Sequence, residues 1–76
     1  MEHLKDLKAG ESGEIVGFTE GDENYKRKLL SLGLTKGTKV KVLRVAPLGD
    51  PMEVEVRGYQ LSLRKDESEI LKVKRI

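Results

Sequence analysis

Residues 44–64, which read RVAPLGDPMEVEVRGYQLSLR, constrain the fold more than any other part of the chain. Two strand-like runs flank a six-residue loop, and both prolines of the chain, Pro47 and Pro51, lie in that loop. Proline fixes its own φ and holds the preceding residue in extended backbone, while Gly49 can adopt a positive φ at little cost. The loop therefore predicts a rigid hairpin connection that sets the register of the two strands.

Apolar residues alternate with polar ones in several short runs, which is typical of half-buried strands. The expected strands cover residues 13–18, 38–46, 52–57, 59–64 and 70–76. In these later strands the expected inward positions are Met52, Val54, Val56, Tyr59, Leu61, Leu63, Leu71 and Val73. The alternation of residues 38–46 slips after Val42, which predicts a β-bulge at that point.

The stretch DENYKRKLLSLG, residues 22–33, changes to a helical period. Its apolar positions at i, i+4 and i+7 are Tyr25, Leu29 and Leu32. Asp22 is the expected N-cap, Gly33 is the expected stop, and the basic residues 26–28 are expected on the outer side. Residues 65–69, KDESE, are expected to form a short turn.

Five short strands with one helix between the first and the second predict a mainly β fold, a small and strongly bent antiparallel barrel. The chain has 76 residues, so we expect a single domain over residues 1–76. It has no cysteine, which excludes disulfides and thiolate metal sites.

Charge is distributed in alternating signs, from 15 basic and 13 acidic residues. Nucleic-acid binders usually carry a clustered basic face, so we expect no nucleic-acid partner. No apolar run approaches the roughly 20 residues that span a bilayer, and the first residues lack the apolar core of a signal peptide. We therefore expect a cytoplasmic protein without direct membrane insertion.

Catalytic and metal-binding constellations are scarce in this sequence. His3 is the one histidine and lies near a terminus that we expect to fray, which makes it a poor general base. No serine or threonine has a second histidine to activate it, and the Gly-rich stretch GESG lacks a phosphate-binding lysine, so we expect no enzyme. Two acidic clusters, Glu20-Asp22-Glu23 and Asp66-Glu67-Glu69, are better explained as a helix start and a solvated turn. We expect no cofactor and no metal site, although a weak site of oxygen ligands stays open.

Two segments are candidates for a partner site. The loop residues are Pro47, Leu48, Gly49, Asp50 and Pro51, and the helix residues are Lys26, Arg27 and Leu30. Leu48 has no evident place in the core, and a rigid loop with an exposed apolar tip lowers the entropic cost of docking. A purely structural role for the loop, with Asp50 serving its turn, and a solvated helix face are the alternatives.

Much of the chain resembles the FeoA family of small ferrous iron transport accessory proteins. The matching residues are the segment Leu29, Leu30, Leu32, Gly33, Leu34 and Gly37, the loop Ala46 through Pro51, and the strand Leu61, Leu63 and Arg64 with Ile70 after it. The opening stretch LKDLKAGESGEIVGF is also similar to that of the family.

This resemblance implies an SH3-like barrel and a cytoplasmic accessory role beside FeoB, a membrane permease for ferrous iron that carries a GTPase. It would make the chain an interaction module that binds and modulates FeoB. The alternative is a protein that binds or senses ferrous iron directly. The open edges of a small barrel leave room for a weak homo-oligomer.

Overall fold

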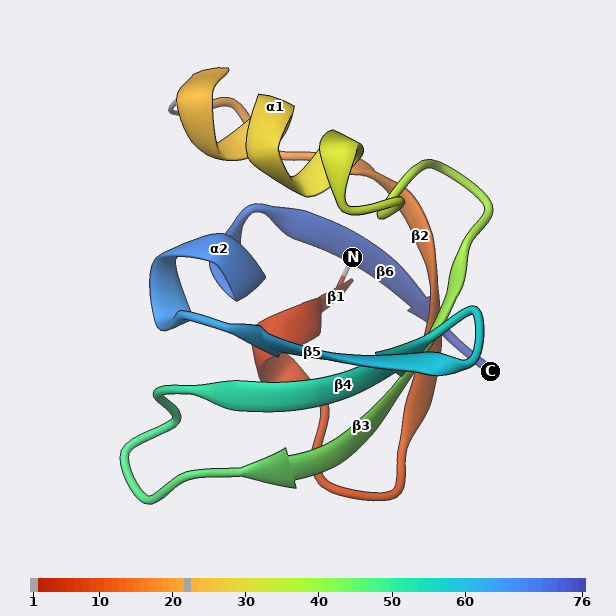
Figure 1. The fold of residues 1–76 in the computed structure, drawn as a ribbon, viewed down its shortest axis with the longest axis vertical. Helices are drawn as coiled ribbons and strands as arrows, with labels where there is room; N and C mark the ends of the chain where they lie inside the picture. Colours follow the sequence, from red (N-terminus) through yellow and green to blue (C-terminus); the bar gives the residue numbers. More distant parts are fainter. Residues whose placement is uncertain (1, 22) are drawn as a thin grey trace.

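The computed structural model describes residues 2–21 and 23–76, and its chain folds around one curved antiparallel sheet (Figure 1). The elements in chain order are β1 (Glu2–His3), the 3-10 helix η1 (Leu4–Asp6), β2 (Ser12–Phe18), α1 (Glu23–Ser31), β3 (Lys39–Val45), β4 (Met52–Val56), β5 (Tyr59–Leu63), α2 (Lys65–Glu69) and β6 (Leu71–Arg75). The strand order in the sheet is β1-β6-β2-β3-β4-β5. The predicted mainly β fold with a helix between the first two long strands is confirmed.

Apolar side chains from the strands and from the helices pack together in one core inside the bent sheet. The fully buried apolar residues are Leu4, Leu7, Ile15, Leu29, Leu34, Val40, Val42, Met52, Val54, Val56, Leu63, Leu71 and Val73. The alternating pattern of β4 is confirmed, because its three apolar residues are buried while Glu53 and Glu55 face outward. Burial of this apolar set, at roughly 25 cal/mol per Å² removed from water, is the main stabilising contribution.

The β3–β4 pair carries the predicted bulge. Val42 lies opposite Val54, but Arg44 lies opposite Glu53, so Leu43 is the extra residue. Lys41 lies opposite Glu55, and Arg44 forms a salt bridge with Glu53 at 3.0 Å between Nε and Oε1. The rigid loop thus holds the register in which the valines of both strands face the core.

Gly33 terminates helix α1 as predicted, two residues after the last helical residue, Ser31. Gly33 has a φ of 89°, its amide donates to the carbonyl of Leu30 at 3.0 Å, and the Leu34 amide donates to the carbonyl of Leu29 at 3.0 Å. This pair of bonds is a Schellman cap, which needs a left-handed residue at this position. The predicted N-cap, Asp22, lies outside the described residues.

Tyr59 corrects one expectation about β5. Its side chain is 42% exposed instead of facing the core, and its hydroxyl donates to the carbonyl of Leu32 at the end of α1. The apolar alternation in YQLSL therefore describes the inward face only at its far end, where Leu63 is buried and Leu61 half-buried. A tyrosine carries a polar tip, so a position where its ring packs while the hydroxyl reaches a carbonyl suits it better than the core.

Elements at the two ends of the chain add to the predicted set. β1 pairs with β6, and η1 brings Leu4 and Leu7 into the core, so the sheet of the described residues has six strands and His3 lies in a paired strand. Residues 65–69 form helix α2 instead of a simple turn. No helix in residues 2–21 and 23–76 has both the length and the apolar character that crossing a bilayer requires.

Candidate interaction surface

The loop between β3 and β4 is held by its own backbone. The Ala46 amide donates to the carbonyl of Pro51 at 3.1 Å, and the Gly49 amide donates to the carbonyl of Ala46 at 2.8 Å. The peptide bond between Asp50 and Pro51 is cis. Gly49 has a φ of 77°, which confirms the predicted left-handed conformation. These bonds fix the backbone of a segment whose side chains are mostly exposed.

Leu48 occupies the tip of this loop in an unusual state. It is 95% exposed, and its φ of 76° places it in the left-handed region. That conformation costs a residue with a Cβ about 1–2 kcal/mol. Neither burial nor backbone preference explains a leucine here. Strained, exposed residues of this kind concentrate at functional positions.

Asp50 links the loop to the following helix. Its Oδ1 accepts a hydrogen bond from the backbone amide of Lys65 at 3.3 Å. Lys65 is the first residue of α2, so the carboxylate serves the start of that helix instead of its own turn, which corrects the expected role. The loop is thereby anchored to α2 as well as to β3 and β4.

Helix α1 presents the second predicted segment. Arg27 is exposed, Leu30 is 40% exposed, and the Lys26 Nζ lies 5.7 Å from the centre of the Phe18 ring. Lys28 is exposed as predicted, with a side chain that is 59% exposed, and its Nζ also lies 2.7 Å from the Glu67 Oε2 on α2. The basic run is thus divided between an exposed arginine, a lysine over an aromatic ring and a lysine in an ion pair.

The two predicted segments do not form one continuous surface. Figure 1 shows the loop and α1 at opposite ends of the molecule. A polar cavity of about 310 Å³ connects their inner sides. Its walls are Lys28, Asp50, Pro51, Ser62, Arg64 and Glu67. Leu48 and Leu30 therefore belong to separate exposed patches.

Glu67 is the buried charge of this cavity, and its side chain is only 3% exposed. Its Oε1 accepts the backbone amide of Arg64 at 2.8 Å, and its Oε2 faces Lys28. Burial alone would raise the pKa of Glu67, but the hydrogen bonds from Lys28 and Arg64 outweigh burial and leave its pKa below the ordinary value. The expectation of a solvated turn at residues 65–69 is therefore wrong at its central residue.

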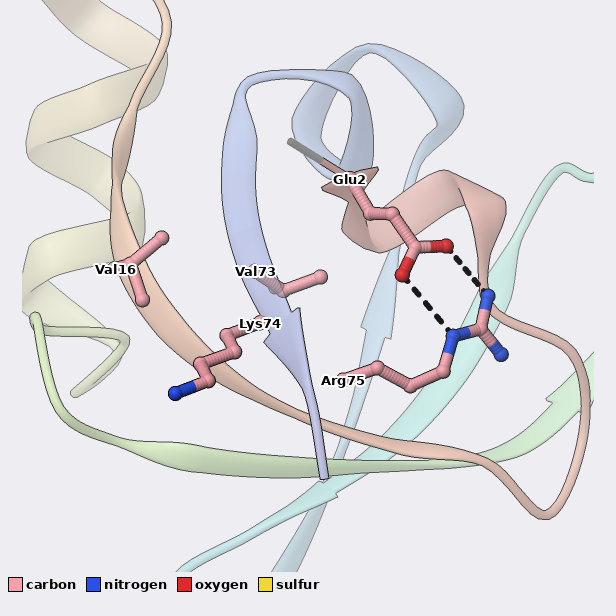
Figure 2. Close-up of a pocket in the computed structure, with 5 residues that line it drawn as sticks. All are labelled: Glu2, Val16, Val73, Lys74 and Arg75. Atoms are coloured by element: carbon pink, nitrogen blue, oxygen red, sulfur yellow. Dashed lines mark hydrogen bonds and ion pairs between the residues drawn. The ribbon is translucent and has the colours of Figure 1, made fainter.

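A second cavity, of about 430 Å³, lies against β1, β2 and β6 (Figure 2). Val16, which is the bulge residue of β2, and Val73 form its apolar part. The Arg75 guanidinium closes one side, with bonds from Nε and Nη2 to the Glu2 carboxylate at 3.0 and 2.6 Å. The adjacent β-formers Ile15 and Val16 before a glycine were the only sequence signal for this bulge.

Two ionisable groups of the Figure 2 cavity, Glu2 and Arg75, are already paired with one another. Arg75 also bonds Glu11, and the hydrogen bonds from Arg75 lower the pKa of Glu2. Elsewhere in residues 2–21 and 23–76, no three histidine or acidic side chains are placed to share a metal ion. The most exposed unexplained feature of the described chain is therefore the Leu48 tip.

Comparison with known proteins places this architecture in a family. The FeoA domain model matches residues 2–75. A fusion of Fe(2+) transport protein A and Fe(2+) transporter FeoB from Porphyromonas gingivalis is 30% identical over 73 residues, which is 96% of this chain. The chain spans 8% of the length of that fusion protein.

Solved structures agree in fold. The FeoA protein of Chlorobium tepidum is 41% identical and superimposes with a TM-score of 0.84, over 99% of this chain and 70% of that one. The FeoA of Stenotrophomonas maltophilia, described as an SH3 domain protein and solved with zinc, is 25% identical with a TM-score of 0.84, over 97% of this chain and 91% of that one. The chain therefore belongs to the FeoA domain family, and its sheet is an SH3-like fold.

Proposed function

We propose that this protein is a non-enzymatic, cytoplasmic interaction module that binds the membrane ferrous iron permease FeoB and modulates its GTPase cycle or its assembly. The observation that carries the proposal is the fusion relative, in which a domain similar to this chain is joined to FeoB. Covalent linkage raises the effective concentration of two partners, and it is useful when the two parts act together.

Leu48 is the proposed centre of the contact, together with its loop neighbours Pro47, Gly49, Asp50 and Pro51. The bonded backbone of the loop holds the leucine in place before binding, so little conformational entropy is lost on docking. An apolar side chain that is 95% exposed gains the most from burial in a partner. Lys26, Arg27 and Leu30 of α1 form the proposed second contact, which a large partner reaches at the other end of the molecule.

Ferrous uptake in a strain that lacks the native protein tests this function. Leu48→Asp and Leu30→Asp are expected to fold and to lower uptake, because each places a charge in a docking patch without touching the core. Ile76→Asp is the matched control, since Ile76 is 58% exposed and lies outside both patches. Titration of isotope-labelled protein with the purified FeoB GTPase domain should shift the amide signals of Leu48, Gly49 and Asp50. Normal uptake by both variants, with no shifts in any nucleotide state, would contradict the proposal.

A further inference from the structure

Strand β5 forms one open edge of the sheet. It pairs with β4 and is the last strand in the sheet order, so no other described strand covers its second side. Figure 1 shows β5 along the front of the molecule, with α1 beyond its free side. An unpaired strand edge presents backbone donors and acceptors that a further strand can satisfy.

The turn between β4 and β5 determines which backbone groups point to the open edge. Arg57 and Gly58 have φ values of 51° and 86°, as in a two-residue type I′ hairpin. Val56 and Tyr59 then close the hairpin as a hydrogen-bonded pair. Because bonded and non-bonded pairs alternate in an antiparallel ladder, Leu61 and Leu63 also bond to β4.

Gln60 and Ser62 therefore direct their amide and carbonyl groups away from β4. Both residues are exposed, and in residues 2–21 and 23–76 neither amide has a backbone partner across the open side. Two donors and two acceptors in an extended row match the backbone of another extended chain. They do not match a helix, whose backbone groups are internally bonded.

The open edge leads into the polar cavity described above, which Ser62 helps to line. Its two carboxylates already accept hydrogen bonds, Glu67 from Lys28 and the Arg64 amide, and Asp50 from the Lys65 amide. The Arg64 guanidinium and the Ser62 hydroxyl make no hydrogen bond within the described ranges, and the Lys28 Nζ has donors left beyond its bond to Glu67. A carboxylate has the charge and the acceptor geometry that an unused guanidinium recognises best.

The charges around β5 also determine which kind of added strand the open edge favours. β5 contains no acidic residue and is flanked by Arg57, Arg64 and Lys65. A second copy paired symmetrically about Leu61 would place Lys65 opposite Arg57 of the other copy, and like charges in that position are destabilising. An acidic strand from a different protein meets no such repulsion.

We propose that β5 accepts an extended, acidic segment of a partner protein by strand addition, with one carboxylate of that segment bound by Arg64 and Lys28 in the cavity. The bonds to Gln60 and Ser62 set the position of the segment, and the cavity selects its charge. The cavity shares Asp50 and Pro51 with the loop, but Leu48 does not line it, and the site does not depend on which protein supplies the segment.

A peptide titration tests the site without the permease. The probe is a synthetic octapeptide that alternates valine and glutamate with threonine at both ends. One control peptide carries lysine in place of glutamate, and another is N-methylated on alternate amides. At ten times the Kd of the probe, solvent exchange of the Gln60 and Ser62 amides should slow about tenfold, while the Leu61 amide should stay unchanged. Neither control peptide should have this effect.

Arg64→Gln provides the second arm and should weaken binding of the probe about tenfold, because a charge-assisted contact is lost. Lys8→Gln removes the same charge from an exposed site outside the cavity and should leave binding within twofold. Three results would each overturn the proposal. They are absence of binding at millimolar probe, equal binding of the lysine peptide, and slowed exchange that misses Gln60 and Ser62.

Discussion

The ion pair between Lys28 and Glu67 allows one energetic argument to be developed in full. Its two partners differ in environment, since the lysine side chain is 59% exposed and the glutamate 3% exposed. Lys28→Met keeps most of the aliphatic stem and removes the charge. A buried carboxylate then remains with a single described hydrogen bond, from the Arg64 amide. Truncating a charged partner leaves the other buried charge without full compensation.

The size of the effect follows from that asymmetry. A fully buried pair loses about 3–5 kcal/mol when one partner is removed, and an exposed pair about 0.2–1 kcal/mol. A pair with one exposed and one buried partner should lie between these limits. Lys28→Met should therefore lower the free energy of unfolding by about 2 kcal/mol at pH 7, which is close to the contribution of one hydrogen bond to a charged group. In a domain of this size, that corresponds to a Tm lower by about 8–16 °C.

The dependence of stability on pH should differ in direction between the native protein and Lys28→Met. In the native protein the pKa of Glu67 is lowered, so its stabilising contribution is present above the ordinary value of 4.5 and is lost as pH falls through the folded-state pKa. Without Lys28, burial should raise the pKa above that value. The contribution of Glu67 then reverses, and stability should fall as pH rises from about 4.5.

Urea unfolding from pH 4 to 8 measures both effects, in Lys28→Met, Glu67→Gln and the double variant. The coupling free energy should be about 1–2 kcal/mol. Arg27→Met is the matched control, because it removes a neighbouring charge that has no described partner. A coupling near zero, or a pH profile of Lys28→Met parallel to that of the native protein, would refute the reasoning.

Three further predictions concern the backbone and the chain ends. Leu48→Val should be about 1 kcal/mol less stable than Leu48→Gly in thermal unfolding, because a β-branched residue tolerates φ of 76° poorly, and equal stabilities would rule out the strain. Gly33→Ala should cost more than about 1 kcal/mol, since its Cβ would lie 3.2 Å from the Tyr59 hydroxyl at a φ of 89°, and denaturant midpoints check this. Glu2→Gln should destabilise at pH 7 but not near pH 3, because Arg75 lowers the pKa of Glu2 and that contribution is lost as pH falls below 4.5; a difference independent of pH would contradict it.

Local patterns in the sequence predicted most of the sheet. Strands such as β4 alternate over enough residues to define a face, and the glycine after α1 marks its end. The opening HLKDLK is too short to show a period, so the burial of Leu4 and Leu7 followed only from the pairing of β1 with β6. Tertiary contact, and not local preference, determined that outcome.

The candidate surface was also predictable only where it depends on a local sequence pattern. Two prolines and a glycine predicted a rigid loop between β3 and β4, and Leu48 was the one apolar residue of that loop without an expected core position. The polar sequence KDESE gave no hint that Glu67 would be buried, because its partner Lys28 is supplied by a different helix. Residues that act through contacts between distant elements leave no mark in a local pattern.

The pairing of β1 with β6 has a consequence for how the molecule folds. β3, β4 and β5 are joined by a six-residue loop and a two-residue turn, so their ladder closes short loops at low entropic cost. The contact between Glu2 and Arg75 joins residues 73 positions apart. We expect the three-stranded meander to form before the folding barrier is crossed and the end-to-end seam to close after it. Substitutions at the seam between β1 and β6 should therefore mainly change the unfolding rate, and substitutions in the three-stranded meander should change the folding rate.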